Sequence, residues 1–150
     1  MSISPSKIKI LLVDDDYVDS ECVKRSLKKL EVSNQLYIAR DGLEALEMIY
    51  SNQQDLIFKG PTLMLLDINM PRMTGLELLE ELEKRNDLDN FTVFMLTSSS
   101  LEEDIEQAYR YNIVAYIMKK NAGNSFIDAI ELVKNYIKTV EFKSKESVQL

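Results

Sequence analysis

The stretch LLDINMPRMTG, residues 65–75, decides the fold because it contains the end of one element and the start of the next. A continuous apolar run, Leu63 to Leu66, precedes a single carboxylate, Asp67. An apolar run bounded by turn residues is typical of a strand that is covered on both faces. Thr74-Gly-Leu-Glu77 then matches a helix capping box, and a leucine-rich helix follows. The stretch predicts a strand, a turn and a helix, with Asp67 where the strand ends.

Strand and helix patterns alternate in the same way on both sides of this stretch. Apolar and β-branched runs predict strands at residues 7–13, 35–39, 62–66, 91–96 and 115–118. Helical spacing and polar caps predict helices at about residues 18–30, from 41, from 74, from 100 to about 111, and at about 125–140. Alternation repeated five times predicts the α/β class, with a doubly wound, five-stranded parallel sheet and helices on both of its faces.

The sequence also predicts two helix caps, one long loop and a polar tail. Asp16 and Ser100 are expected to cap the first and fourth helices. Residues 51–61 form a polar loop that is longer than the usual connection in such folds. Residues 141–150 are expected to be a frayed polar tail.

Composition limits the classes of function. A chain of 150 residues that is 45% hydrophobic has the size and composition of one globular domain. Its net charge of −7 disfavours binding to nucleic acid or to an anionic membrane. The single cysteine, Cys22, cannot form an internal disulfide and is expected to be a half-buried, inert thiol. No signal peptide or membrane span is visible, so a cytoplasmic protein is expected.

Polar side chains gather where the predicted strands end. Asp14 and Asp15 follow the first strand, Asp67 the third, Thr97 the fourth and Lys119 the fifth. The carboxyl ends of parallel strands lie at one edge of the sheet, where ligands of this architecture bind. Several carboxylates a few ångströms apart cannot all stay ionised without a compensating cation. Hard oxygen ligands without histidine favour Mg²⁺, with Mn²⁺ as the alternative.

This combination of side chains suits phosphoryl transfer. Mg²⁺ usually binds one or two carboxylates together with phosphate oxygens. A carboxylate can act as the nucleophile and form an aspartyl phosphate, while the cation and an ammonium offset the transferred charge. Asp67 is the natural nucleophile because it stands alone on a central strand and leaves the pair Asp14 and Asp15 for the metal.

The ordered motifs VDD, LLDINMPRMTG, MLTSSS and AYIMKK resemble those of the receiver domain of two-component response regulators, over about residues 7–140. The resemblance implies a single receiver domain across residues 1–150, with a CheY-like, flavodoxin-like fold and strand order 2-1-3-4-5. It implies that Asp67 accepts a phosphoryl group from a histidine kinase or a histidine phosphotransfer protein. Asp15 would bind Mg²⁺ directly and Asp14 largely through water, and the backbone carbonyl of Asn69 would be a further ligand.

The same resemblance implies a switch. The Thr97 hydroxyl would donate to a phosphoryl oxygen and Lys119 would pair with another. Tyr116 would follow the movement of Thr97 and alter a docking surface formed by the fourth helix, the fifth strand and the fifth helix. Lys119 has a rival in its neighbour Lys120, but strand alternation and the spacing from Tyr116 favour Lys119. Receiver domains usually have a cis-linked proline where this chain has Lys120, so the conformation of this peptide and the placement of Lys119 are open.

The long loop before the third strand and the extended last helix look most like the single-domain regulators that partner bacterial phytochrome-type kinases. No output domain is expected after the fifth helix, so the output would be docking onto a downstream protein. Association with a second copy through the fourth and fifth helices also remains open, although the fourth helix offers a modest apolar surface, formed by Leu101, Ile105, Ala108 and Tyr109.

Two other functions share parts of this pattern. A small phosphatase with an aspartate nucleophile resembles DxDxT at this site, but Asn69 stands where its second aspartate would act as the acid and base. The protein is therefore not expected to be an enzyme beyond slow self-dephosphorylation. An interaction module that keeps the fold but signals without phosphate remains an alternative.

Overall fold

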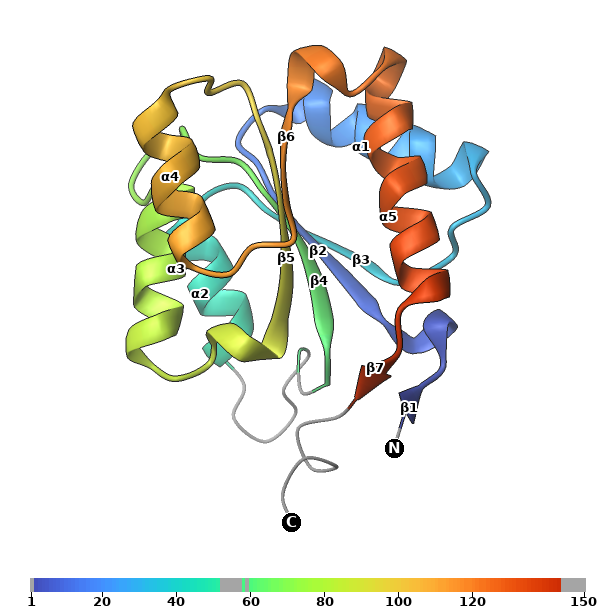
Figure 1. Cartoon of the computed structure of the whole chain (residues 1–150), viewed down its shortest axis with the longest axis horizontal. Helices are drawn as coiled ribbons and strands as arrows, with labels where there is room; N and C mark the ends of the chain where they lie inside the picture. The colour runs from blue at the N-terminus through green and yellow to red at the C-terminus, as the bar shows by residue number, and fades with distance from the viewer. Residues whose placement is uncertain (1, 52–57, 59, 144–150) are drawn as a thin grey trace.

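A computed structural model describes residues 2–51, 58 and 60–143 and contains one central parallel sheet (Figure 1). Its strands are β2 (Lys9–Val13), β3 (Leu36–Ala39), β4 (Thr62–Leu66), β5 (Phe91–Thr97) and β6 (Ala115–Met118). They lie in the order β3-β2-β4-β5-β6, and every neighbouring pair is parallel. Counted along the chain, this is the order 2-1-3-4-5, which confirms the predicted doubly wound α/β sheet.

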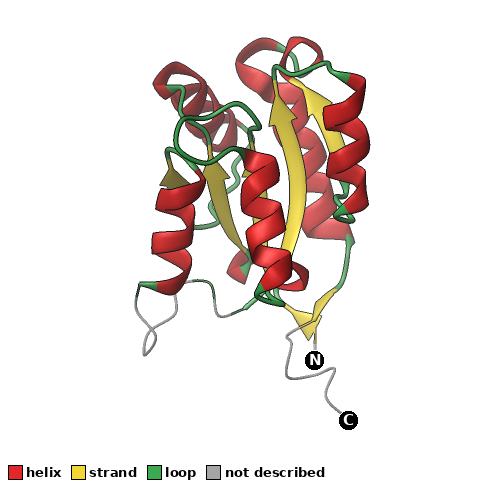
Figure 2. Ribbon diagram, turned by 90° about the vertical axis from the view of Figure 1, so that its left-hand side faces the viewer, coloured by secondary structure: helices red, strands yellow, loops and turns green. Residues whose placement is uncertain are grey.

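Helices cover both faces of the sheet. They are α1 (Tyr17–Lys29), α2 (Gly42–Tyr50), α3 (Gly75–Lys84), α4 (Glu102–Arg110) and α5 (Ile127–Thr139). Short 3-10 turns are η1 (Pro5–Lys7), η2 (Leu88–Asn90), η3 (Lys119–Asn121) and η4 (Asn124–Phe126). Figure 1 shows α1 and α5 on one face of the sheet and α2, α3 and α4 on the other, and Figure 2 shows the strands enclosed between these layers.

Alternate side chains of the central strands enter two separate cores. Leu11 of β2 and Leu66 of β4 pack under α2 and α3, whereas Leu12 and Leu65 pack under α1 and α5. All four side chains are at most 1% exposed. Burial on both faces explains why these strands read as continuous apolar runs, because successive residues of a strand point to opposite sides.

Several predicted element ends are corrected by the structure. The first strand begins at Lys9, not at residue 7, because Pro5–Lys7 forms the turn η1. Ser100 does not cap the fourth helix: α4 begins after Leu101, whose side chain makes no capping hydrogen bond. The fifth helix begins at Ile127, two residues late, because Ser125 and Phe126 have left-handed backbone angles (φ of 53° and 60°). Other predictions hold: Asp16 caps α1, and Cys22 is half-buried.

The expected frayed tail is wrong at its start. Two short strands, β1 (Ser2–Ile3) and β7 (Phe142–Lys143), pair antiparallel beside the end of α5. Phe142 is 6% exposed and stacks edge-on against Tyr136, with ring centroids 5.9 Å apart. Tyr136 in turn stacks edge-on against Phe94 of β5 at 5.1 Å. The pairing of β1 with β7 is called the terminal clasp below.

The predicted long loop and the predicted polar tail lie partly outside the described residues. The structure does not describe residues 52–57 and 59 of the loop or residues 144–150 of the tail. Among the residues that the structure describes, no helix has the length and apolar character needed to cross a membrane.

Candidate functional site

Three carboxylates meet at the carboxyl ends of β2 and β4. Val13 and Leu66, the last residues of these adjacent strands, are direct partners in the sheet, so Asp14 and Asp67 follow side by side. Oxygen atoms of Asp14, Asp15 and Asp67 lie within 4.8 Å of one another. Asp14 and Asp67 are 2% and 7% exposed, while Asp15 is open to solvent. The predicted convergence of these three side chains is therefore present in the fold.

Lys119 extends from the end of β6 into this group of acids. Its Nζ lies 2.8 Å from Asp14 Oδ2, 2.7 Å from Asp19 Oδ2 and 3.4 Å from Asp67 Oδ2. The Lys119 side chain is only 9% exposed. One ammonium therefore bridges three carboxylates, and the positive charge that the repulsion between acids demands is partly supplied by the chain itself.

The pKa values of Asp14 and Lys119 are both raised, but for different reasons. Burial raises the pKa of Asp14 to about 6, although its hydrogen bond to Lys119 opposes the shift. Burial alone would lower the pKa of Lys119, but hydrogen bonds to Asp14 and Asp19 and the charge of Asp67 raise it above its usual range. Lys119 is thus a permanent cation at neutral pH, whereas Asp14 is a carboxylate that is costly to keep ionised.

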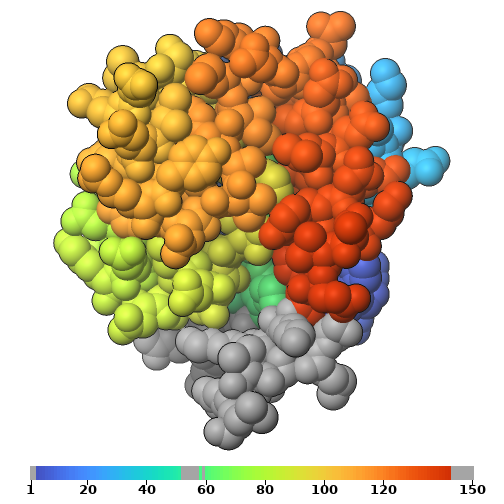
Figure 3. Space-filling view, viewed as in Figure 1, coloured from blue at the N-terminus to red at the C-terminus, as the bar shows by residue number. Residues whose placement is uncertain are grey.

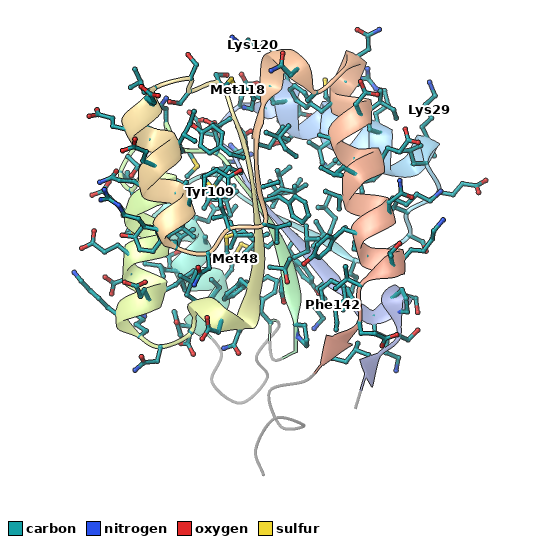
Figure 4. All side chains as sticks on the ribbon, viewed as in Figure 1. Lys29, Met48, Tyr109, Met118, Lys120 and Phe142 are labelled. Atoms are coloured by element: carbon teal, nitrogen blue, oxygen red, sulfur yellow. The ribbon has the colours of Figure 1, made fainter. Side chains whose placement is uncertain are left out.

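Lys119, and not its neighbour Lys120, reaches the acids. Lys120 is exposed and lies at the outer side of the turn after β6 (Figure 4). The peptide between Lys119 and Lys120 is trans, like every peptide bond in the described residues. The absence of proline after Lys119 therefore goes with a trans link and the 3-10 turn η3, and Lys119 still reaches Asp67.

Thr97 and Tyr116 link the acids to the start of α4. Thr97 ends β5, is fully buried, and its hydroxyl oxygen accepts from the backbone amides of Ile68 at 3.4 Å and Ser99 at 3.3 Å. The Tyr116 hydroxyl donates to the backbone carbonyl of Ser99 at 2.9 Å. A continuous set of contacts therefore runs from the residue after Asp67, through Thr97 and Ser99, to Tyr116 of β6.

The loop after Asp67 is held at its far end by the capping box. Thr74 Oγ1 accepts from the Glu77 amide at 3.2 Å, and Glu77 Oε1 accepts from the Thr74 amide at 3.0 Å. Gly75 donates its amide to the Ile68 carbonyl at 2.9 Å, which folds the loop back on itself. Asn69 lies inside this loop and is exposed. Its carbonyl as a metal ligand remains a prediction.

A second attachment ties the same loop to α2. Arg72 binds both carboxylate oxygens of Asp41, with Nε 2.7 Å from Oδ2 and an Nη atom 3.1 Å from Oδ1. Asp41 also caps α2 by accepting from the Glu44 amide at 2.9 Å. Burial would raise the pKa of Asp41, but its hydrogen bonds to Arg72 and the Glu44 amide lower it. The loop that follows Asp67 is therefore fixed from two sides.

Asp19 belongs to the site although the sequence does not predict it, and one predicted surface residue is buried. Asp19 is in the first turn of α1, where an acid is ordinary because it favours the helix dipole, so nothing in the sequence singled it out. Ala108, expected on the apolar surface of the fourth helix, is fully buried in the core. Leu101 and Tyr109 are 59% and 49% exposed, as that surface requires.

The acids fit a divalent cation. They offer only oxygen atoms, which are the ligands that Mg²⁺ and Mn²⁺ prefer. The exposed Asp15 gives access from solvent, and burial raises the pKa of Asp14, so a cation beside this carboxylate would favour its ionised form. Asp14, Asp15 and Asp67 can therefore hold a divalent cation.

Comparisons with known proteins agree with this geometry. The family described as response regulator receiver domain matches residues 10–131. Response regulator Rcp1 of Synechocystis sp. is 31% identical over 133 residues, which are 89% of this chain and 90% of that protein. The crystal structure of the Mn²⁺-bound form of Rcp1 aligns with a TM-score of 0.77 and 29% identity, covering 91% of this chain and 99% of that one. The phosphorylated cyanobacterial phytochrome response regulator RcpA aligns with a TM-score of 0.72 and 28% identity over 89% and 95% of the two chains.

Proposed function

The chain belongs to the response regulator receiver domain family of two-component signalling, and from this premise we propose that it accepts a phosphoryl group on Asp67. One observation carries the proposal: the Asp67 carboxylate ends the central strand beside two further acids and within 3.4 Å of the Lys119 ammonium. A nucleophilic carboxylate with a cation beside it is an arrangement that favours acyl phosphate formation.

The proposed transfer needs a phosphohistidine donor. A carboxylate oxygen of Asp67 forms a bond to phosphorus, the phosphorus–nitrogen bond breaks, and the histidine nitrogen leaves with the electron pair. Lys119 offsets the charge on one phosphoryl oxygen, and the Thr97 hydroxyl donates to another. Asp15 would hold Mg²⁺ or Mn²⁺ directly, with Asp14 acting largely through water and the Asn69 carbonyl as a further ligand. When bound, the cation neutralises charge on the phosphoryl oxygens.

The donor is proposed to be a histidine kinase or a histidine phosphotransfer protein, because receiver domains partner such proteins. The kinase is proposed to be of the phytochrome type, because the similar structure RcpA is a cyanobacterial phytochrome response regulator. The chain acts in this proposal as a signalling protein whose only catalysis is slow hydrolysis of its own acyl phosphate.

The output is proposed to be a change in a docking face formed by α4, β6 and α5. In the space-filling view these elements form one continuous surface (Figure 3). Tyr109 of α4, Leu101 just before this helix and Leu132 of α5 are exposed. Phosphorylation would draw the Thr97 hydroxyl toward the new oxygens, which alters its contact with the Ser99 amide and hence the Ser99 carbonyl that Tyr116 binds. A downstream protein, or a second copy of this chain, would read the change.

The test is labelling with acetyl phosphate, read by intact-protein mass spectrometry. Wild type with Mg²⁺ is expected to gain one phosphoryl group, Asp67→Asn none, and Asp15→Ala very little. Asp89→Asn, which removes an exposed acid of η2, is the matched control and should label like wild type. Undiminished labelling of Asp67→Asn would refute the acceptor, and full labelling in EDTA would refute the metal. A wild-type protein that binds a kinase but takes no label would favour the module that signals without phosphate.

A further inference from the structure

The shortest contact of Lys119 is with Asp19, a residue outside the motifs that define the site. The two atoms, Lys119 Nζ and Asp19 Oδ2, are 2.7 Å apart, closer than Lys119 is to Asp67. The two side chains are 9% and 22% exposed, so solvent weakens this ion pair less than one at the surface. Asp19 comes from α1 and Lys119 from the turn after β6, and the contact joins segments that are 100 residues apart in the chain.

The helix cap explains why the Asp19 carboxylate is available. An acid three residues after a helix cap often accepts from the backbone amide of the capping residue. Here the amide of the cap, Asp16, instead donates to Asp14 Oδ1 at 2.9 Å. Asp16 Oδ1 accepts from the Asp19 amide at 3.0 Å and so fixes the backbone of Asp19. The Asp19 carboxylate has no capping task and turns toward Lys119.

The three carboxylates that contact Lys119 have different roles in the proposed function. An ammonium has three N–H groups, and here it faces three carboxylates. Asp14 is a proposed metal ligand through water, and Asp67 loses its free carboxylate when it takes the phosphoryl group. Asp19 has neither task. Among these partners it alone can keep the same ion pair with Lys119 before, during and after transfer.

The turn that carries Lys119 supplies little restraint of its own. Lys119 begins the short turn η3 and is followed by Lys120, not by a proline that would fix the backbone. The Phe126 ring is 6.0 Å from Lys119 Nζ and closes one side without a hydrogen bond. A long lysine side chain loses much rotamer freedom when it is held in one position, so the restraint must come from its partners.

We propose that Asp19 is a positioning residue that holds the Lys119 ammonium at the phosphoryl site throughout the phosphorylation cycle. The proposal rests on the function proposed above, since it gives Asp19 a task only if Lys119 acts on the phosphoryl group. Asp19 does not touch that group. It acts through Lys119, and its whole contribution to the rate therefore depends on Lys119 being present.

A double-mutant cycle tests this dependence. Asp19→Asn, which keeps the shape of the side chain, is expected to slow labelling by acetyl phosphate about threefold to tenfold, the range for residues coupled by direct contact. In the Lys119→Ala background the same change should alter the rate by less than about twofold, since the coupled partner is gone. Glu21→Gln is the matched control: it removes a carboxylate of the same helix whose ion-pair partner within the described residues is the exposed Lys24 and not Lys119. Equal effects of Asp19→Asn in both backgrounds, or an effect no larger than that of Glu21→Gln, would overturn the proposal.

A second measurement is independent of phosphorylation. In Mg²⁺-free protein the Lys119 ammonium should give a protected ¹H–¹⁵N NMR signal, because it is buried and lies against three carboxylates. Asp19→Asn is expected to broaden or shift this signal, and Glu21→Gln to leave it in place. An unchanged signal in Asp19→Asn would overturn the role of Asp19 even if the variant labels slowly. Failure of wild type to label at Asp67 would refute the proposed function, whereas the NMR signal would still report whether Asp19 holds Lys119.

Discussion

Gly75 lies against the backbone of Asp67 so closely that a β-carbon at position 75 would overlap the Asp67 carbonyl oxygen. The first residue of α3 and the proposed phosphoryl acceptor are thus in direct backbone contact. Gly75→Ala is expected to lower the free energy of unfolding by about 1 to 3 kcal/mol or more, because backbone must shift to admit the methyl group. The same shift displaces Asp67, so the rate of labelling by acetyl phosphate should also fall. Chemical denaturation measures the loss of stability.

Gly60→Ala provides the control for this change. Among the described residues, no atom beyond its chain neighbours lies within 4 Å of where its β-carbon would sit, so stability and labelling should both match wild type. A Gly75→Ala protein as stable as the Gly60→Ala protein would show that the loop after Asp67 can yield without cost.

Asp14 is expected to make the metal-free protein less stable as pH rises. Its pKa is raised by burial from 3.8 to about 6, so between these values the folded chain binds more protons than the unfolded chain. The free energy of unfolding therefore falls as pH rises through this window and stays lower above it. Asp14→Asn should stabilise the protein above about pH 6 by about 2 kcal/mol, allowing for solvent in the pocket.

Urea denaturation in EDTA at a series of pH values measures this effect. The advantage of Asp14→Asn should shrink as pH falls from about 6 and vanish below about pH 3, where the wild-type carboxyl is protonated in both states. Asp89→Asn, which changes the same charge at an exposed position, should show no such dependence. A gain of equal size at both ends of the pH range would contradict the assignment to ionisation of Asp14.

Tyr116→Phe removes the hydrogen bond from β6 to the Ser99 carbonyl and nothing else of the side chain. Stability is expected to fall by about 1 kcal/mol, the typical value for one such bond. If Tyr116 carries the change from Asp67 outward, the amide shifts that phosphorylation causes in α4 should shrink, while the labelling rate stays within about twofold of wild type.

Heteronuclear NMR of the labelled protein measures those amide shifts. Tyr109→Phe is the control, because it removes the same hydroxyl from a tyrosine of α4 (Figure 4) that is 49% exposed, whereas Tyr116 is half-buried. Amide shifts in Tyr116→Phe that equal those of wild type would show that the change reaches α4 by another route.

Phe142→Ala tests the terminal clasp. The ring is 6% exposed and packs on Tyr136, so its loss is expected to cost about 2 to 4 kcal/mol in unfolding free energy, toward the lower end for buried aromatic residues. Val140→Ala, two residues earlier and 38% exposed, should cost less than about 0.5 kcal/mol. Thermal unfolding followed by circular dichroism compares them, and equal losses would mean that β7 contributes nothing to the fold.

The position of the acids was predictable because it depends on a rule of parallel sheets. Once β2 and β4 are read as neighbouring parallel strands, Asp14 and Asp67 must follow side by side. Thr97 and Lys119 follow from the same rule, since each ends a strand of the same sheet. Predicting these positions requires only where each strand ends and the order of the strands, and the apolar runs in the sequence indicate the strand ends.

The features that the sequence did not predict depend mostly on contacts between segments that are distant in the chain. The partner of Asp19 is decided by how α1 lies against the turn after β6, which no local pattern contains. The strands of the terminal clasp have two residues each, too few for any alternation to be visible. The cap position of α4 falls on Leu101, one residue past Ser100, and the Ser99 hydroxyl donates to Asp104 of that helix.

The terminal clasp also decides how the molecule can be handled. Because β1 pairs with β7, the two ends of the described chain leave side by side at the edge of the sheet opposite to Asp67 (Figure 1). Immobilising the protein on a sensor chip through a tag at either end leaves the acids facing the flowing solution. All immobilised molecules then present the side that carries Asp67 to a kinase in solution, so the association and dissociation rates of the kinase can be measured directly.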